Sequence, residues 1–335
     1  MQHGVVRLSL LKRSILVKHY VGIDLGGTEV KIGIINGDGT IVKKDSFKTE
    51  SSMNGDQLVA YMAECSKKVV TAAGMSMKDI TGAGIGSAGL LNPDTGQLRI
   101  VTNIPQLNDV FIAPGIAKIL GVPAFLDNDV NAMVLGEFFY GAAKGYKDVV
   151  AMTLGTGVGG GLIFDGKIYR GASFTAGEIG HMSIDTDGLH CPCGNYGCLE
   201  RYIGRDGIIQ RFKTYLSKGI ETNINNHLDK GEITPRAIAQ AAEAGDRLAR
   251  EVMEETGRIL GNALATLVNV LNPEVFVIGG GVANAGDLIL EPARREMKKR
   301  AYTIPAQKAI IVPAALKNDA GIVGSACVAV DKLSA

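Results

Sequence analysis

A run of histidine, cysteine and glycine near the middle of the chain constrains its fold more than any other stretch. Four residues within eighteen positions carry metal-binding side chains: His181, Cys191, Cys193 and Cys198. Three thiolates and one imidazole suit tetrahedral Zn²⁺, and four protein ligands close its coordination sphere. We therefore predict a structural zinc site. A loop with accidental cysteines is the alternative, although three of the five cysteines fall within eight positions.

Two carboxylates flank this run. Glu178 precedes His181 by three residues, and Glu200 follows Cys198 by two. A metal would hold both carboxylates in place, and they could then accept hydrogen bonds from sugar hydroxyls. His181 could serve twice, with one ring nitrogen on the metal and the other on a hydroxyl. A histidine that only binds the metal is the alternative.

Two glycine loops follow strand-like apolar segments, one in each half of the chain. Asp24-Leu-Gly-Gly-Thr28 ends the segment 20–25, and Thr153-Leu-Gly-Thr-Gly157 ends the segment 148–154. Each loop is followed by a further strand and a glycine turn typical of a β-hairpin. Such loops can turn backbone N–H groups toward phosphate. The predicted phosphate-binding residues are Gly26, Gly27, Thr28, Gly155, Thr156 and Gly157.

The residues in and around these loops also indicate what kind of phosphate site they could form. Asp24 would repel a phosphate unless Mg²⁺ lay between them, so the pattern predicts Mg²⁺ bound with the nucleotide. No Gly-Lys-Ser/Thr follows a glycine cluster, which excludes a Walker A loop. Gly159-Gly-Gly161 is expected to interrupt the strand that starts at residue 148. For one loop taken alone, a turn without a ligand is an equal alternative.

Asp129 is the candidate catalytic base. It follows the strand-like segment 122–126 and begins a predicted helix that runs to residue 139. Asp127 or Asn128 could cap that helix alone, which leaves Asp129 available for chemistry, although a plain cap is the alternative. We expect the helix dipole to keep Asp129 ionised and weakly basic. Phosphoryl transfer tolerates a weak base because orientation of the hydroxyl matters more.

The stretch from His181 to Glu200, His-x₉-Cys-x-Cys-Gly-x-x-Gly-Cys-x-Glu, resembles the signature of the ROK family of sugar kinases and sugar-responsive repressors. The resemblance covers residues 20–329. It implies an α/β, two-lobed actin/hexokinase-like (ribonuclease H-like) fold with duplicated β-hairpin glycine loops and an inserted zinc-binding loop.

The resemblance also implies roles for individual residues. Asp129, within Asn128-Asp-x-Asn-Ala132, would be the catalytic base, and Asp24 would act through Mg²⁺. Gly279, Gly280 and Gly281 would border adenosine. The implied sugar-binding residues are Gly89, Asn103, Asn128, Asp129, Glu178, His181 and Glu200. The family usually has Asn-Leu and a Trp near Asn103, whereas this chain has Asn103-Ile-Pro-Gln106 and no Trp, so the hexose stays open.

Length and composition fit this picture. A chain of 335 residues with 46% hydrophobic content can form two cores. We expect an N-terminal extension (1–19), a small lobe (20–128, completed by 314–335) and a large lobe (129–313).

A net charge of +1 gives no sign of a nucleic-acid partner. No apolar run reaches the length of a membrane span. Three cysteines clustered in a metal-like spacing, with Cys65 and Cys327 single and distant, argue against a disulfide framework and favour a reducing, cytoplasmic location.

The resemblance implies ATP-dependent phosphorylation of a hexose at its 6-hydroxyl, as at the entry to glycolysis, with glucose as the expected sugar. Kinases for N-acetylmannosamine, allose or fructose are alternatives within the family. A sugar-responsive transcriptional repressor is an alternative of another class. Such repressors carry a helix-turn-helix domain before the first glycine loop, and about twenty residues precede Asp24 here. Hexose and ATP are the expected partners, and we expect a homo-oligomer, either a dimer or a tetramer.

Overall fold

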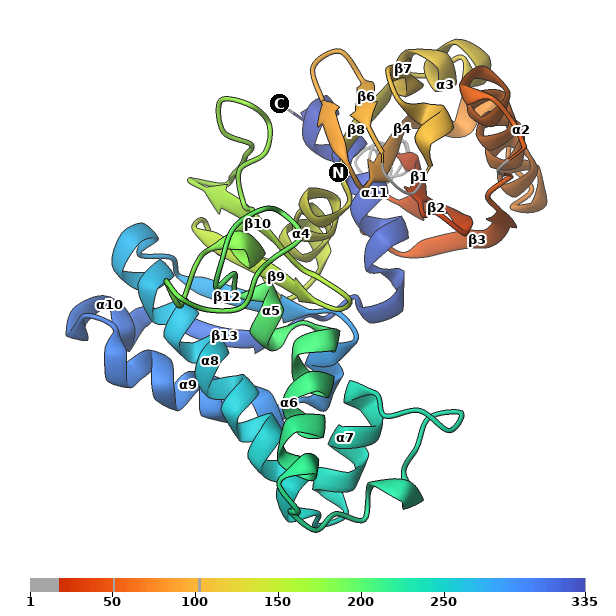
Figure 1. The fold of residues 1–335 in the computed structure, drawn as a ribbon. Helices are drawn as coiled ribbons and strands as arrows, with labels where there is room; N and C mark the ends of the chain where they lie inside the picture. Colours follow the sequence, from red (N-terminus) through yellow and green to blue (C-terminus); the bar gives the residue numbers. More distant parts are fainter. Residues whose placement is uncertain (1–17, 51, 102–103, 335) are drawn as a thin grey trace, which may run out of the picture. The chain divides into compact units, whose positions relative to one another are not determined.

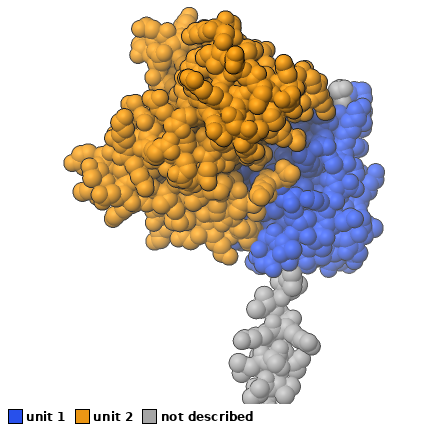
Figure 2. Space-filling view, turned by 90° about the horizontal axis from the view of Figure 1, so that it is seen from below, with its two compact units in different colours: residues 1–136, 319–335 blue, residues 137–318 orange. Residues whose placement is uncertain are grey.

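The structure is a computed structural model that describes residues 18–50, 52–101 and 104–334. The chain divides into two compact units, residues 1–136 with 319–335 (unit 1) and residues 137–318 (unit 2), coloured separately in Figure 2. The predicted extension lies outside the described residues up to position 17. The division into functional lobes with borders at 128/129 and 313/314 stays a prediction.

Unit 1 is built on a five-stranded sheet in the order β3-β2-β1-β4-β8. Its strands are β1 (His19–Leu25), β2 (Glu29–Asn36), β3 (Ile41–Lys48), β4 (Ile80–Ser87) and β8 (Ala124–Asn128). The first three strands form antiparallel hairpins, and β4 and β8 run parallel to β1. The strand-like segments 20–25 and 122–126 of the sequence match β1 and β8 to within two residues at each end.

Helices cover both faces of this sheet. Buried residues of α2 (Gly55–Ala72) and α3 (Ile112–Leu120) form one core with Val21, Ile23 and Ile32 on the first face. The closing helix α11 (Ala320–Ser334) lies on the other face (Figure 1). A Cβ at Gly22 would lie 2.1 Å from the backbone oxygen of Ile322, and one at Gly84 would lie 1.8 Å from that of Ser325. Glycine at both positions therefore allows α11 to pack directly on the strands.

Unit 2 repeats the plan of unit 1 with a sheet in the order β11-β10-β9-β12-β13. Its strands are β9 (Val149–Leu154), β10 (Val158–Phe164), β11 (Lys167–Tyr169), β12 (Val275–Gly279) and β13 (Ile310–Pro313). Again three antiparallel strands come first, and two strands parallel to the first of them follow. This repetition confirms the predicted α/β fold with duplicated β-hairpins.

The expectation that Gly159-Gly-Gly161 interrupts a strand was wrong. These glycines lie inside β10 and pair with residues 151–153 of β9. They are needed for packing: a Cβ at Gly160 would lie 2.5 Å from the backbone oxygen of Gly177 and 2.6 Å from the side chain of Ile179. The glycines of β10 therefore allow Gly177 and Ile179, which precede the metal-binding run, to lie against the sheet.

The helices of unit 2 pack around one core together with β9, β10 and β12. They are α5 (Glu200–Ile203), α6 (Arg205–Ser217), α7 (Pro235–Glu243), α8 (Arg247–Leu271), α9 (Asp287–Arg300) and α10 (Thr303–Lys308). Helix α4 (Asp129–Tyr140) begins in unit 1 and ends in unit 2. Among the described helices, none combines the length and apolar character that a bilayer crossing requires.

Candidate active site and metal centre

Three parallel strands of unit 1 end at one edge of the sheet and bring the predicted catalytic carboxylates there. Asp24 at the end of β1 pairs with Gly86 of β4, and Ser87 pairs with Asn128 of β8. Asp129 follows directly as the first residue of α4. Burial raises the pKa of Asp24, and the nearby charge of Asp129 adds to this effect. This edge carries the acidic groups that phosphoryl transfer would use.

The start of α4 is capped without the need for Asp129. Asn128 Oδ1 accepts hydrogen bonds from the backbone N–H groups of Val130 (2.9 Å) and Asn131 (3.3 Å). Buried Asp127 holds the cap, since its Oδ1 accepts from Asn128 N (2.8 Å) and Asn131 Nδ2 (3.0 Å). Asp129 adds only a bond from Val130 N at 3.0 Å. Capping therefore gives no sufficient reason for an aspartate at position 129.

The acidity of Asp129 differs from the expectation based on the helix dipole. Burial raises the pKa of this carboxyl above its ordinary value, and the hydrogen bond from Val130 N offsets only part of that effect. Burial also raises the pKa of Asp24, while nearby Lys31 lowers it. Asp129 is thus a stronger base than the helix dipole alone predicts, which favours proton acceptance.

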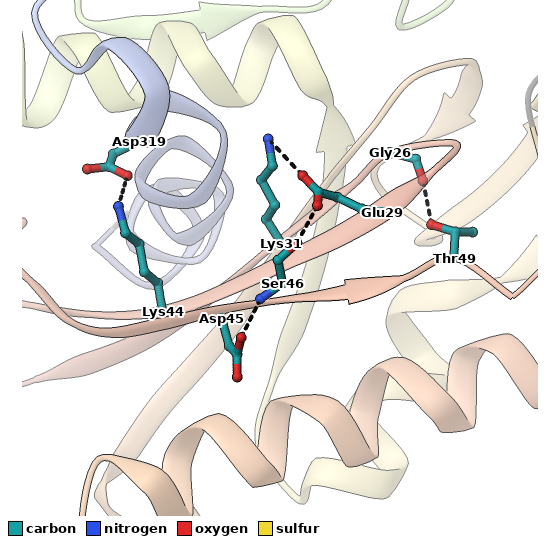
Figure 3. A network of polar contacts seen from close by, with 8 residues as sticks. All are labelled: Gly26, Glu29, Lys31, Lys44, Asp45, Ser46, Thr49 and Asp319. Carbon is teal, nitrogen blue, oxygen red and sulfur yellow. Dashed lines mark hydrogen bonds and ion pairs between the residues drawn. The ribbon is translucent and has the colours of Figure 1, made fainter.

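The first glycine loop is held closed by a threonine that the sequence analysis did not single out. Thr49 donates its hydroxyl to the backbone oxygen of Gly26 at 2.8 Å (Figure 3). Its backbone N–H donates to the oxygen of Thr28 at 2.9 Å. Gly26 N in turn donates to Glu29 O at 3.1 Å. Thr49 is buried, with 6% of the residue exposed. It lies just beyond β3, too far along the chain for any local motif to mark it.

If the loop binds MgATP as the sequence predicts, replacing Thr49 by valine is expected to raise KM for MgATP about two- to tenfold with little change in KM for the sugar, because a part-buried carbonyl loses its donor and the loop loosens. Steady-state kinetics with each substrate varied in turn measure this. Thr49→Ser keeps the hydroxyl and should stay near the wild-type values. An equal rise in both KM values, or a serine variant as weak as valine, would contradict a role in shaping this loop.

Two predicted nucleotide loops lie next to each other in unit 2. Strands β9 and β12 are parallel, with Thr153 opposite Gly279. A Cβ at Gly280 would lie 2.4 Å from the backbone oxygen of Leu154, and φ of Gly280 is +90°. The loops 155–157 and 279–281 therefore follow neighbouring strand ends, where α/β sheets commonly bind ligands.

A cavity of about 370 Å³ adjoins the second of these loops. It lies beside α7 and the short helix η6 (Val282–Ala285), and its lining includes Arg236, Gln240, Glu243, Gly281 and Asn284. A Cβ at Gly281 would meet no atom within 4 Å, so this glycine faces open space. The volume and the polar lining suit a small ligand.

The four predicted metal ligands come together in unit 2. The ligand atoms of His181, Cys191, Cys193 and Cys198 all lie within 4.8 Å of one another. Cys193 Sγ and Cys198 Sγ are 3.6 Å apart, and Cys191 Sγ lies 3.8 Å from His181 Nδ1. Tetrahedral zinc with Zn–S bonds of about 2.3 Å would place its sulfur ligands about 3.8 Å apart. The cluster could hold a metal ion of this kind.

The thiols of this cluster are crowded in a way that a cation would relieve. Burial, followed by the neighbouring thiols, raises the pKa of Cys198 to about 12. Hydrogen bonds from Asn195 and Cys191 instead lower the pKa of exposed Cys193. Three thiolates at this spacing repel one another unless a positive ion lies between them. The donor set therefore fits a metal better than it fits free thiols.

The predicted sugar-binding residues of unit 2 surround this cluster. His181 turns Nδ1 toward Cys191 and has Nε2 3.9 Å from Glu178 Oε2. Glu200 Oε2 accepts a hydrogen bond from Val158 N at 2.9 Å, next to the loop 155–157. Glu200 thus joins the metal-binding run to the second glycine loop. That bond occupies one carboxylate oxygen of Glu200.

Two further predicted contacts belong to unit 1. Gly89 has φ of +108°, and a Cβ there would lie 2.3 Å from the backbone oxygen of Ile100, so the position requires glycine. Asn103 lies outside the described residues. The structure therefore places Asp24, Asn128 and Asp129 at one strand edge of unit 1, and Glu178, His181 and Glu200 around one cluster of unit 2.

Comparison with known proteins gives the family. The ROK family matches residues 20–332 of this chain. A glucokinase of Halalkalibacterium halodurans is 36% identical over 309 residues, which cover 91% of this chain and 93% of that protein. The chain therefore belongs to the ROK family.

Both kinases and repressors occur among the similar proteins. The crystal structure of a ROK family glucokinase from Streptomyces griseus in complex with glucose and AMPPNP is 30% identical, has a TM-score of 0.73 and covers 92% of this chain and 98% of that one. A xylose repressor of Caldicellulosiruptor bescii is 31% identical over 92% of this chain and 77% of its own length. Membership of the family therefore leaves the choice of function to the residues of the site.

Proposed function

We propose that the protein is a glucokinase, which transfers the terminal phosphoryl group of ATP to the 6-hydroxyl of glucose. The observation that carries the proposal is the common edge of β1, β4 and β8. It presents Asp24 and Asp129 beside the glycine loop, and the cap of α4 leaves Asp129 available. The glucokinase relatives in both comparisons support the same activity.

In this proposal Asp129 accepts a hydrogen bond from the 6-hydroxyl and orients its oxygen toward the phosphorus. As the O6–P bond forms, the bond to the ADP leaving group breaks and the hydroxyl proton passes to Asp129. The raised pKa of this half-buried carboxyl favours that last transfer. Backbone N–H groups of the loops 26–28 and 155–157 would bind phosphate oxygens. Mg²⁺, held through Asp24, would neutralise phosphate charge when bound.

We also propose that the ion in the Cys₃His cluster is zinc and that its role is structural. The support is the sulfur-rich ligand set, the 3.6 and 3.8 Å spacings and the presence of four protein ligands, which would fill a tetrahedral coordination sphere. The metal would fix Glu178, His181 and Glu200 for sugar hydroxyls.

A cytoplasmic location, a role in glycolysis and a dimeric or tetrameric state also stay proposals.

A coupled assay of ADP release tests the function, with ATP and Mg²⁺ over a panel of glucose, N-acetylmannosamine, allose and fructose. Turnover with any hexose supports a kinase. The absence of turnover with every sugar, together with sugar-dependent DNA binding, would instead favour the repressor alternative that the xylose repressor suggests.

Glucose should exceed N-acetylmannosamine in kcat/KM by at least about tenfold. The reason is that Glu178 and Glu200 accept hydrogen bonds, and an N-acetyl group offers one N–H with added bulk where glucose offers a 2-hydroxyl. Glu178 is exposed in the structure, but a bound sugar would shield its carboxylate from water, and a shielded carboxylate left short of a donor costs about 1–3 kcal/mol. The measurement is kcat/KM for both sugars under identical ATP and Mg²⁺. If N-acetylmannosamine equals or exceeds glucose, the assignment of glucose is wrong and the kinase assignment survives.

A further inference from the structure

Glu137 is a buried carboxylate for which the proposed function gives no role. It lies in the last turn of α4 and is 0% exposed. A negative charge near the carboxyl end of a helix is unfavourable, and a charge removed from water is costly unless hydrogen bonds compensate it. The stability of α4 alone therefore gives no reason for a glutamate at this position.

Three backbone N–H groups from two segments of the chain donate to this carboxylate. Oε2 accepts from Ala142 N at 2.7 Å, just after α4, and from Ala315 N at 3.0 Å. Oε1 accepts from Leu316 N at 2.8 Å. Gly141 leaves room for these bonds, since a Cβ there would lie 2.1 Å from Glu137 Oε2. Glu137 thus links the end of α4 to a segment that begins 178 residues further along the chain.

These two segments are the places where the chain crosses between the two units. The chain leaves unit 1 after residue 136, within α4, and returns to it at residue 319, just before α11. Glu137 is the first residue of unit 2, and Ala315 and Leu316 lie just before the return. The carboxylate therefore links the outgoing crossing to the returning crossing within unit 2.

Both crossings lead to groups that the proposed function uses. The outgoing crossing is α4, which begins with Asp129. The returning crossing contacts the strand that leads into the nucleotide loop 279–281. Ala314 N donates to Ile278 O at 2.9 Å, and a Cβ at Gly279 would lie 3.1 Å from Ala314 Cβ. Glu137 therefore links the helix of the candidate base to the segment beside the nucleotide loop.

Within unit 1 the same two crossings are in contact without a charged group. A Cβ at Gly324 of α11 would lie 2.4 Å from the backbone oxygen of Ala132 in α4, so the two helices pack with their backbones in contact. A Cβ at Gly321 would lie 2.1 Å from Asp24 Oδ2, which places the first turn of α11 against that carboxylate. The returning crossing thus also reaches the group that is proposed to hold Mg²⁺.

We propose that Glu137 is a positioning residue for phosphoryl transfer, which fastens the two crossings to each other so that groups of both units act on one phosphate. This inference rests on the proposed kinase function. The binding groups themselves are held by other contacts, the loop 26–28 by Thr49 and Glu200 by Val158 N. Each unit would keep its own ligand when the link is lost, whereas the transfer step, which needs both units, would slow.

Hydrogen exchange followed by mass spectrometry tests the link itself. Glutamine in Glu137→Gln keeps the shape of the side chain but turns an NH₂ group toward backbone N–H donors, so at least one of the bonds is lost. The amides of Ala315 and Leu316 should then exchange about ten- to hundredfold faster than in the wild type. If Glu137→Gln is unstable, Gly141→Ala serves, because its Cβ would displace the carboxylate without removing it.

Asp246→Asn is the matched control. Asp246 is buried, with 5% exposed, and its carboxylate accepts from the backbone N–H groups of Asn223 (2.6 Å) and Ala249 (2.8 Å). It therefore also links two segments of unit 2, but away from both crossings. This variant should lower the melting temperature as Glu137→Gln does, and leave kcat and the exchange of Ala315 and Leu316 unchanged.

Kinetics and calorimetry distinguish a positioning role from a contribution to stability. In Glu137→Gln, kcat should fall about ten- to hundredfold. The Kd values for glucose and for MgATP, measured separately by titration calorimetry, should stay within about twofold of the wild type. A rise of both Kd values together with the fall in kcat would show a general loss of structure and overturn the positioning role.

The remaining outcomes separate this inference from the proposed function. Unchanged exchange of Ala315 and Leu316 in Glu137→Gln would overturn the link. Faster exchange with an unchanged kcat would show that the link supports only the fold. Wild-type protein that phosphorylates no hexose would refute the proposed function, and with it the role of Glu137 in transfer, whereas faster exchange in Glu137→Gln would still establish the link between the crossings.

Discussion

Replacing Asp129 by asparagine is expected to lower kcat about 10²- to 10⁴-fold while the fold and the affinity for sugar stay nearly unchanged. Asparagine keeps the size of the side chain but cannot accept the proton of the 6-hydroxyl. The cap of α4 should persist because Asn128 and Asp127 make it. Steady-state kinetics give kcat, calorimetry gives the sugar Kd, and thermal unfolding reports the fold.

Asp287→Asn is the matched control, since Asp287 is likewise the first residue of a helix, α9, but lies far along the chain from the glycine loops. Its kcat should equal that of the wild type. A variant Asp129→Asn that retains most of the wild-type kcat would refute the assignment of the base. A large fall in its melting temperature would show that position 129 is structural.

The second large effect concerns the metal centre. Purified protein should contain close to one zinc ion per chain, and Cys193→Ser should lose it together with at least about tenfold in sugar affinity. Cys193 is exposed, whereas Cys191 and Cys198 are buried, so the substitution removes a ligand without leaving a hole in the core. The sugar affinity should fall because Glu178, His181 and Glu200 lose their fixed positions.

Elemental analysis of protein prepared without chelators measures the zinc, and calorimetry measures sugar binding. Cys65→Ala, which removes a buried cysteine of α2 away from the cluster, should keep the full metal content. Fresh wild-type protein without zinc would contradict the proposal. Full glucose affinity in a metal-free sample would show that the metal does not organise the sugar-binding residues.

Much of the fold could be predicted because its signals are local. The apolar segments 20–25 and 148–154, each followed by a glycine turn, marked the first hairpin of each sheet, and the repetition of Asp24-Leu-Gly-Gly-Thr28 by Thr153-Leu-Gly-Thr-Gly157 marked their duplication. The spacing of the cysteines marked the metal cluster, since four ligands close in sequence need little else to meet. Such features depend on neighbours within one loop or one strand.

The features of the fold and of the site that could not be predicted depend on contacts between segments that are distant in the sequence. The small sheet of β5 (Leu90–Asn92), β6 (Gln97–Ile100) and β7 (Val110–Phe111) was missed because its strands are too short to show a period. Residues 110–111 form a strand only through their pairing with β6. The acidity of Asp129 depends on burial, and the role of Thr49 depends on a loop twenty residues earlier. No pattern within a short window contains such information.

Because α11 lies at the end of the chain, the glycine-lined face on which it packs is covered only late in synthesis. Unit 1 consists of both ends of the chain, whereas unit 2 is continuous. A ribosome therefore delivers β1 to β8 first and the helix that packs on Gly22 and Gly84 last. Throughout the synthesis of residues 137–318, one face of the nascent sheet lacks its cover. Translation that stalls before residue 319 would leave that face bare, a surface suited to chaperones and proteases.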